Sequence, residues 1–326
     1  MHPLDDADLH AGLTGLELAT ESVDLGDGVL LAPTHAKFLT PLTLVNTSPP
    51  STDPLKPKPA FWQMGAREKD ITVQLIIPRH VAKSFDERFE LARFAVLVLR
   101  LWSDPGIGLH VVSSHRFEEL CELPDNDRPF IVPIETRPRH FPLGTIDPTS
   151  VLASLKWVQE NWRAAHKLYS SSTEFRLAAD SLDAGQFVPN HALTLVSLWA
   201  SLEAIFSPST SELKFRVSAL IAAYLEPPGA KRLELQKQVA SLYDMRSAAA
   251  HGKPRHEPEH LLKSFELVRR VLLRMIHEAA VPTKELLERR LFSGSHVLRG
   301  NPRLARAAVQ IRRSAANLNY HAARCN

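Results

Sequence analysis

The chain has 326 residues, which is enough for about two domains of ordinary size and for a substantial hydrophobic core. Its hydrophobic content of 44% and its charged content of 23% are ordinary for a soluble globular protein. The formal net charge of +3 is too small to indicate a nucleic-acid partner by itself, so only the distribution of charge along the chain is informative.

The number of cysteines and the length of the apolar runs indicate where in the cell the protein is expected. Cys121 and Cys325 are the only cysteines, and two so far apart favour neither a disulfide scaffold nor a Cys-based zinc module. A reducing cytoplasm is the natural setting. The first residues lack the basic and apolar regions of a signal peptide, and apolar runs such as Phe94–Leu99 are too short to span a membrane. We therefore expect a cytoplasmic protein with no membrane partner.

Residues 1–147 mix short β-prone runs with a helix. The runs are bounded by glycine and proline, as strands usually are. Phe85–Trp102 carries apolar residues at spacings of three and four, which predicts a helix. Residues 48–59 are rich in proline and are expected to form a loop. The sequence predicts an α+β domain here with a sensing or specificity role. The β-prone runs begin at Leu16, Val29, Ile71 and Leu109.

Residues 148–282 have the pattern of long helices with few strand signals. The loops between them are short, which favours antiparallel neighbours and a helical bundle. Pro258 falls in the first turn of the last of these helices, where proline is tolerated. We therefore expect an all-α domain. Its predicted helices are Val151–Leu168, Val188–Phe206, Leu213–Leu225, Lys231–His251 and Glu257–Glu278.

Residues 283–326 form a basic tail. They hold nine lysines and arginines against two glutamates, a net charge of +7, while the rest of the chain is slightly acidic. Two interpretations stand equally: the tail binds RNA phosphates, or it forms an exposed arginine-rich helix. The candidates for RNA contact are Arg303, Arg306, Arg312 and Arg313.

The fourth predicted helix ends in a segment whose side chains could take part in catalysis, Leu242-Tyr-Asp-Met-Arg-Ser-Ala-Ala-Ala-His-Gly252. Ser247 and His251 are four residues apart and so lie on one helix face, where the serine is placed to orient the imidazole. Arg246 and His251 are five apart, about 140° around a regular helix. Either the helix ends near His251, as Gly252 favours, or the working pair comes from two chains.

An arginine and a histidine near one another have complementary chemistry toward a phosphate ester. A histidine can move protons near neutral pH, and an arginine can hold phosphate oxygens while charge develops. Neither role requires a metal. The structural alternative is that Arg246 is a solvated or salt-bridged residue and that His251 sits at a helix C-terminus, where a cation is favoured.

The same segment resembles the HEPN superfamily, and within it the ApeA-like type, in which Leu-Tyr-x-x-Arg-Ser-x-x-x-His-Gly ends a helix of a small bundle. Ala200–Phe206 resembles an earlier Ala-Leu-Glu-Ala-like segment of that family, and Glu212–Arg216 followed by an alanine-rich helix also fits. The resemblance covers residues 190–280. It implies metal-independent RNA cleavage at a site shared by two protomers. It gives roles to Arg246 in phosphate binding, His251 in proton transfer, Ser247 in orienting His251, and Glu203, Arg216, Tyr243 and Asp244 in supporting the site.

Two functions follow as expectations. The first is a HEPN-type endoribonuclease without a cofactor, acting on RNA as a homodimer, in the manner of a toxin or antiphage-defence effector. The second is a non-catalytic HEPN module that binds RNA, a nucleotide or a partner protein; Ser247 favours it, because many active members carry Asn, Asp or His there. Residues His256 and His260 are spaced as a metal pair but lack an evident third ligand, so we expect no metal site.

Overall fold

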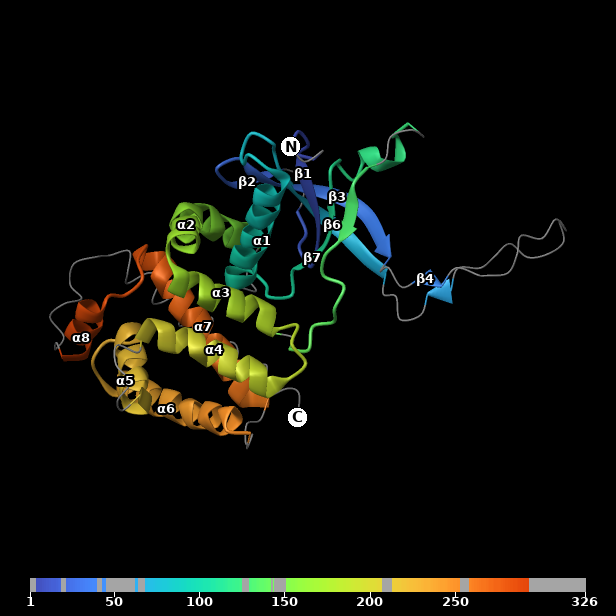
Figure 1. Cartoon of the computed structure of the whole chain (residues 1–326). Helices are drawn as coiled ribbons and strands as arrows, with labels where there is room; N and C mark the ends of the chain where they lie inside the picture. The colour runs from blue at the N-terminus through green and yellow to red at the C-terminus, as the bar shows by residue number, and fades with distance from the viewer. Residues whose placement is uncertain are drawn as a thin grey trace. The chain divides into compact units, whose positions relative to one another are not determined.

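The computed structural model describes residues 4–18, 22–39, 43–44, 62–63, 68–124, 129–141, 143, 151–206, 213–252 and 258–292. Contacts within the chain divide it into two compact units. The first comprises residues 1–96 and 107–138, and the second comprises residues 97–106 and 139–326. The first unit contains the β-sheet, and the second is built of helices (Figure 1).

The first unit is built around a six-stranded antiparallel sheet with the strand order β2-β3-β6-β1-β7-β8. Strand β1 is central and pairs with β6 from Leu9↔Ile77 to Leu13↔Val73. The strands of this sheet are β1 (Leu9–Thr14), β2 (Val23–Gly26), β3 (Val29–Leu39), β6 (Glu68–Ile77), β7 (Gly108–Ser113) and β8 (Ile131–Pro133). The unit also contains the short pair β4 (Thr43–Leu44) and β5 (Trp62–Gln63), the short helix η1 (Glu119–Cys121) and the first turns of α1 (Phe85–Trp102).

One face of the sheet is apolar where it crosses β1, since Leu9, Ala11 and Leu13 alternate along this strand with no exposed surface. Helix α1 adds a buried arginine to this unit. The Arg88 guanidinium is inaccessible to solvent and donates hydrogen bonds to the carbonyl oxygens of Leu4, Asp5 and Ala82. A buried guanidinium needs such acceptors, so Arg88 ties the N-terminal turn to the start of α1.

The opposite face of the sheet carries a buried polar pair, His10 and Gln74. Gln74 Nε2 donates to both carboxylate oxygens of Glu118, at 2.8 and 2.9 Å, which fastens the segment before η1 to the sheet. Burial lowers the pKa of His10, and the nearby Arg116 lowers it further, against the opposing effect of Asp8. The buried surroundings of His10 therefore favour its neutral form over the charged one.

This burial makes stability depend on pH. The folded chain binds fewer protons at His10 than the unfolded chain once the pH falls below the usual histidine pKa of about 6.5. The free energy of unfolding should then decrease toward acid, by at most about 1.4 kcal/mol per pH unit. Denaturant unfolding at neutral and mildly acidic pH measures this loss, and His10→Gln should lose less than the native chain. Equal losses in the two proteins would show that His10 does not contribute.

The second unit is all helical. Its large core side chains include Trp162, Trp199, Phe206 and Phe265, and the indole of Trp199 donates to Ser264 Oγ across helices, at 3.2 Å. Ser172 caps α3 by accepting the amide of Phe175. The helices are α2 (Val151–Ser171), α3 (Thr173–Gly185), α4 (His191–Phe206), α5 (Leu213–Leu225), α6 (Ala230–Ala250), α7 (Pro258–Glu278) and α8 (Lys284–Phe292).

The expected order, an α+β part followed by an all-α part, is confirmed in this coarse form. Helices α1 and α5 have the predicted bounds, and Pro258 is the first residue of α7. The strand expected from Leu16 is wrong, because β1 ends at Thr14 and Gly15 turns the chain with φ +77°. Helix α3 was not predicted. The proline-rich residues 48–59 and the tail beyond residue 292 lie outside the described residues.

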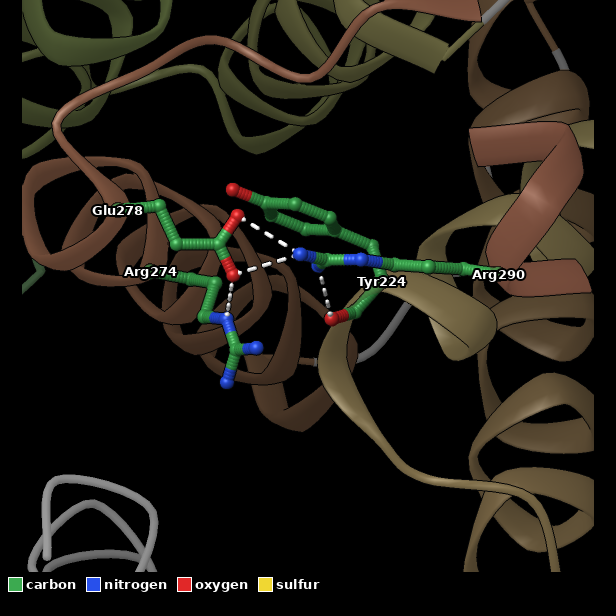
Figure 2. A network of polar contacts seen from close by, with 4 residues as sticks. All are labelled: Tyr224, Arg274, Glu278 and Arg290. Atoms are coloured by element: carbon green, nitrogen blue, oxygen red, sulfur yellow. Dashed lines mark hydrogen bonds and ion pairs between the residues drawn. The ribbon is translucent and has the colours of Figure 1, made fainter. Parts of the chain in front are cut away.

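Helix α8, the first part of the basic tail, is fixed to the bundle by a charged network (Figure 2). Arg290 Nη2 donates to both oxygens of Glu278 on α7, at 2.9 and 3.0 Å, and Arg274 binds the same carboxylate. The Arg290 guanidinium also lies over the Tyr224 ring of α5, 4.9 Å from its centroid. Arg232 of α6 donates to the Arg290 carbonyl oxygen. Three helices thus hold α8 where the tail begins.

Candidate active site at the end of helix α6

The segment that carries the Arg-Ser-x-x-x-His motif is the last turn of α6 and its C-terminal cap. The helix ends at Ala250, and the cap residue His251 donates its amide to the Ser247 carbonyl oxygen, at 3.2 Å. Gly252 follows with a backbone φ of +68°, a conformation that residues other than glycine rarely adopt. Helix α6 therefore includes Arg246 and ends one residue before His251.

Arg246 is joined to helix α4 by an ion pair. Its Nη2 lies 2.9 Å from Glu203 Oε2, and the two side chains are only 22% and 21% exposed. The guanidinium also lies over the ring of Tyr243, one turn earlier on α6, at 5.5 Å from the centroid. Tyr243 is buried and meets the indole of Trp199 edge-on. The arginine is thereby held from one side by a carboxylate and from beneath by an aromatic ring.

Burial affects the pKa values and the hydrogen bonding of this cluster. Burial raises the pKa of Tyr243, and the adjacent Glu203 carboxylate raises it further. Arg246 Nε is buried and has no hydrogen-bond partner in the part of the chain that the structure describes. A charged donor without an acceptor is costly inside a protein. The Nε–H of Arg246 is therefore an unsatisfied donor buried within the ion pair.

The remaining supporting residues divide into two kinds. Asp244 forms an ion pair with Lys214 of α5, at 2.6 Å between Oδ2 and Nζ, and both side chains are about half exposed. Arg216 is exposed and forms no ion pair with any described residue. Glu203 forms its ion pair with Arg246 and not with Arg216. The structure thus joins Glu203, Arg246 and Tyr243, and leaves Arg216 on the surface.

The imidazole of His251 is exposed, whereas Ser247 is half-buried. Among the described residues, no hydrogen bond joins the side chain of Ser247 to that of His251, and none joins Arg246 to His251. A single chain therefore presents a fixed arginine and a solvent-accessible histidine without direct contact between them. The expected orienting role of Ser247 stays a prediction.

Other candidate residues lie outside the described structure. These are Arg303, Arg306, Arg312 and Arg313 of the tail, and His256 of the histidine pair. Within the described ranges, no cluster of three or more His, Cys, Asp or Glu side chains is arranged to bind a metal ion. No described helix combines the length and apolar character that crossing a membrane requires.

Sequence reasoning missed two participants in the site. Lys214 neutralises Asp244, and Trp199 supports Tyr243 from below. An aromatic residue one turn before Glu203 on the same helix was the available signal for Trp199. No comparable signal pointed to Lys214, since its contact depends on how α5 packs against α6.

Comparisons with models of protein families, with curated proteins and with solved structures find no match for this chain. The likeness to HEPN proteins therefore rests on the motif residues themselves, and it stays a proposal.

The Glu203–Arg246 ion pair should contribute more to stability than the neighbouring exposed pair. A double-mutant cycle with Glu203→Gln and Arg246→Gln is expected to give a coupling free energy of about 1–3 kcal/mol, because the partners are shielded from water. The control cycle, Lys214→Gln with Asp244→Asn, should give less than about 1 kcal/mol, since exposed pairs are screened. Unfolding by denaturant measures both. Similar coupling in the two cycles would contradict the rigid placement of Arg246.

Proposed function

We propose that this chain is a metal-independent endoribonuclease of HEPN type that acts as a homodimer in the cytoplasm. The observation that carries the proposal is the position of two side chains at one helix end. Arg246 is fixed by Glu203 with about a fifth of its side chain exposed, and His251 is exposed at the helix cap. A held cation and an accessible imidazole are the two groups that cleavage through the 2′-hydroxyl needs.

The proposed reaction is an attack by the 2′-hydroxyl oxygen on the adjacent phosphorus. The bond from phosphorus to the 5′-oxygen breaks, which leaves a 2′,3′-cyclic phosphate and a 5′-hydroxyl. The imidazole of His251 takes the proton of the 2′-hydroxyl and delivers a proton to the departing 5′-oxygen. Arg246 binds the phosphate oxygens as negative charge grows on them.

The separation of Arg246 from His251 within one chain supports a dimer. One described chain offers one exposed histidine at this end of α6, and His251 makes no contact with Arg246 of its own chain. A two-fold axis near Gly252 would bring two copies of the segment together through one self-complementary patch. The pair of sites would then hold two imidazoles and two guanidinium groups.

The wider role follows from this activity. RNA cleavage of this kind fits a toxin or an antiphage-defence effector that halts growth. The first unit would then provide sensing or specificity, and the basic tail beyond α8 would bind RNA phosphates. A non-catalytic module that binds RNA, a nucleotide or a partner protein is the alternative, and Ser247 is the residue that favours it.

The activity test is cleavage of total RNA by the purified protein in the presence of EDTA. Products should end in 2′,3′-cyclic phosphate, and DNA should be left intact because it lacks the nucleophile. His251→Ala should lower turnover by roughly 10²–10⁴-fold, with little change in melting temperature. Arg246→Lys should also be poorly active, since it keeps the charge but loses the planar fork.

The matched control is His80→Ala, which removes another exposed histidine, in the first unit. This variant should cleave RNA at the native rate. Full activity in His251→Ala, loss of activity in EDTA, or equal cleavage of DNA would each overturn the mechanism. RNA binding without any cleavage would favour the non-catalytic alternative.

A further inference from the structure

Beside the proposed active site, the first turn of α5 exposes an aromatic ring between two cations. Phe215 is 63% exposed, although the eight residues from Val217 to Tyr224 on the same helix are all buried. Lys214 and Arg216, on either side of it, are exposed as well. An aromatic ring left in water on an otherwise buried helix forgoes the free energy that burial would give it.

The position of this turn is fixed relative to Arg246. Lys214 Nζ bonds Asp244 Oδ2, and Asp244 lies two residues before Arg246 on α6. Helices α5 and α6 are packed against each other along their length, as Lys214–Asp244 and the more distant Ser218–Gln236 contact show. The exposed ring therefore lies at the same end of the bundle as the ion pair of Arg246.

We propose that Phe215 is a stacking platform for an unpaired base of single-stranded RNA, with Lys214 and Arg216 contacting the phosphates on either side. This inference rests on the proposed function, because it concerns how the same substrate is held. Stacking on an aromatic ring flanked by cations is the chemistry by which proteins bind single strands. Successive helix residues point about 100° apart, so the two cations diverge around the ring.

Charge favours RNA over a second copy of this chain as the partner of this turn. Arg216 has no acidic partner among the described residues, and Lys214 pairs with Asp244 in a contact whose two side chains are about half exposed. In a two-fold contact through this turn, each Arg216 would approach like-charged residues of the other copy. A phosphate backbone would instead neutralise both cations and cover the ring with a base.

A duplex cannot supply such a base, because its bases are paired and stacked on one another. The platform therefore predicts a preference for unpaired RNA. It places the selection at the binding step, separate from the chemistry at His251.

The test measures binding in a His251→Ala background, so that cleavage does not interfere. A fluorescently labelled poly(U) strand and an RNA duplex serve as probes in anisotropy titrations. Replacing Phe215 by Ala should weaken poly(U) binding by roughly 5- to 150-fold, the range for one base stacked on an aromatic ring. Phe215→Trp should retain binding. Replacing Arg216 by Gln should reduce the salt dependence of the affinity by about 0.7 in slope.

The matched control is Leu233→Ala, which removes an exposed apolar residue near the opposite end of α6. It should leave the affinity unchanged. Unchanged affinity in Phe215→Ala, or equal weakening in Leu233→Ala, would overturn the platform. Conversion of the dimer to monomer by Phe215→Ala would also overturn it, in favour of a protein interface, and light scattering detects this.

The outcomes separate this inference from the proposed function. If the native protein binds poly(U) through Phe215 but does not cleave RNA, the platform stands and the ribonuclease proposal fails. If it cleaves RNA and Phe215→Ala binds and cleaves normally, the ribonuclease stands and the platform fails.

Discussion

The ion pair between Glu203 and Arg246 is the constraint on which the candidate site depends. The two side chains lie mostly out of water, so neither charge can lose its partner without a large penalty. The bond joins residues 43 positions apart and fixes α6 against α4. With Tyr243 beneath the guanidinium, it also limits which face of Arg246 other groups can reach. In the proposed ribonuclease the arginine would thus be in place before the substrate arrives, which is what electrostatic stabilisation of a transition state requires.

The side chains at this end of the bundle differ in how firmly they are held. Arg246 is held from two sides, whereas His251 is exposed at a helix cap next to a glycine with positive φ. A proton carrier must reach both solvent and substrate, and a phosphate-binding group must keep its place. The Lys214–Asp244 pair lies beside them but is about half exposed, so it contributes little energy and leaves the lysine available. The site therefore combines a fixed cation, an accessible base and an open aromatic turn.

Local patterns in the sequence were sufficient for most helices and for the motif. The bounds of α1 and α5 follow from apolar spacing, and Gly252 marks the end of α6. The pairing of Glu203 with Arg246 could not be predicted this way, because it depends on how α4 packs against α6. The sequence pattern did not separate helix α3 from α2, because only Ser172 lies between them and that serine is the N-cap of α3. The β-prone run at Leu16 was misleading because Gly15 had already turned the chain.

The most direct test of the account uses two inactive variants of the same protein. Arg246→Ala and His251→Ala are unfolded together, refolded as a mixture, and assayed for RNA cleavage. If each site takes its arginine from one protomer and its histidine from the other, mixed dimers contain one intact site. Activity should then return to about a quarter of the native level, since half of the dimers are mixed. A mixture as inactive as the separate variants, beside an active native dimer, would contradict a site shared between protomers.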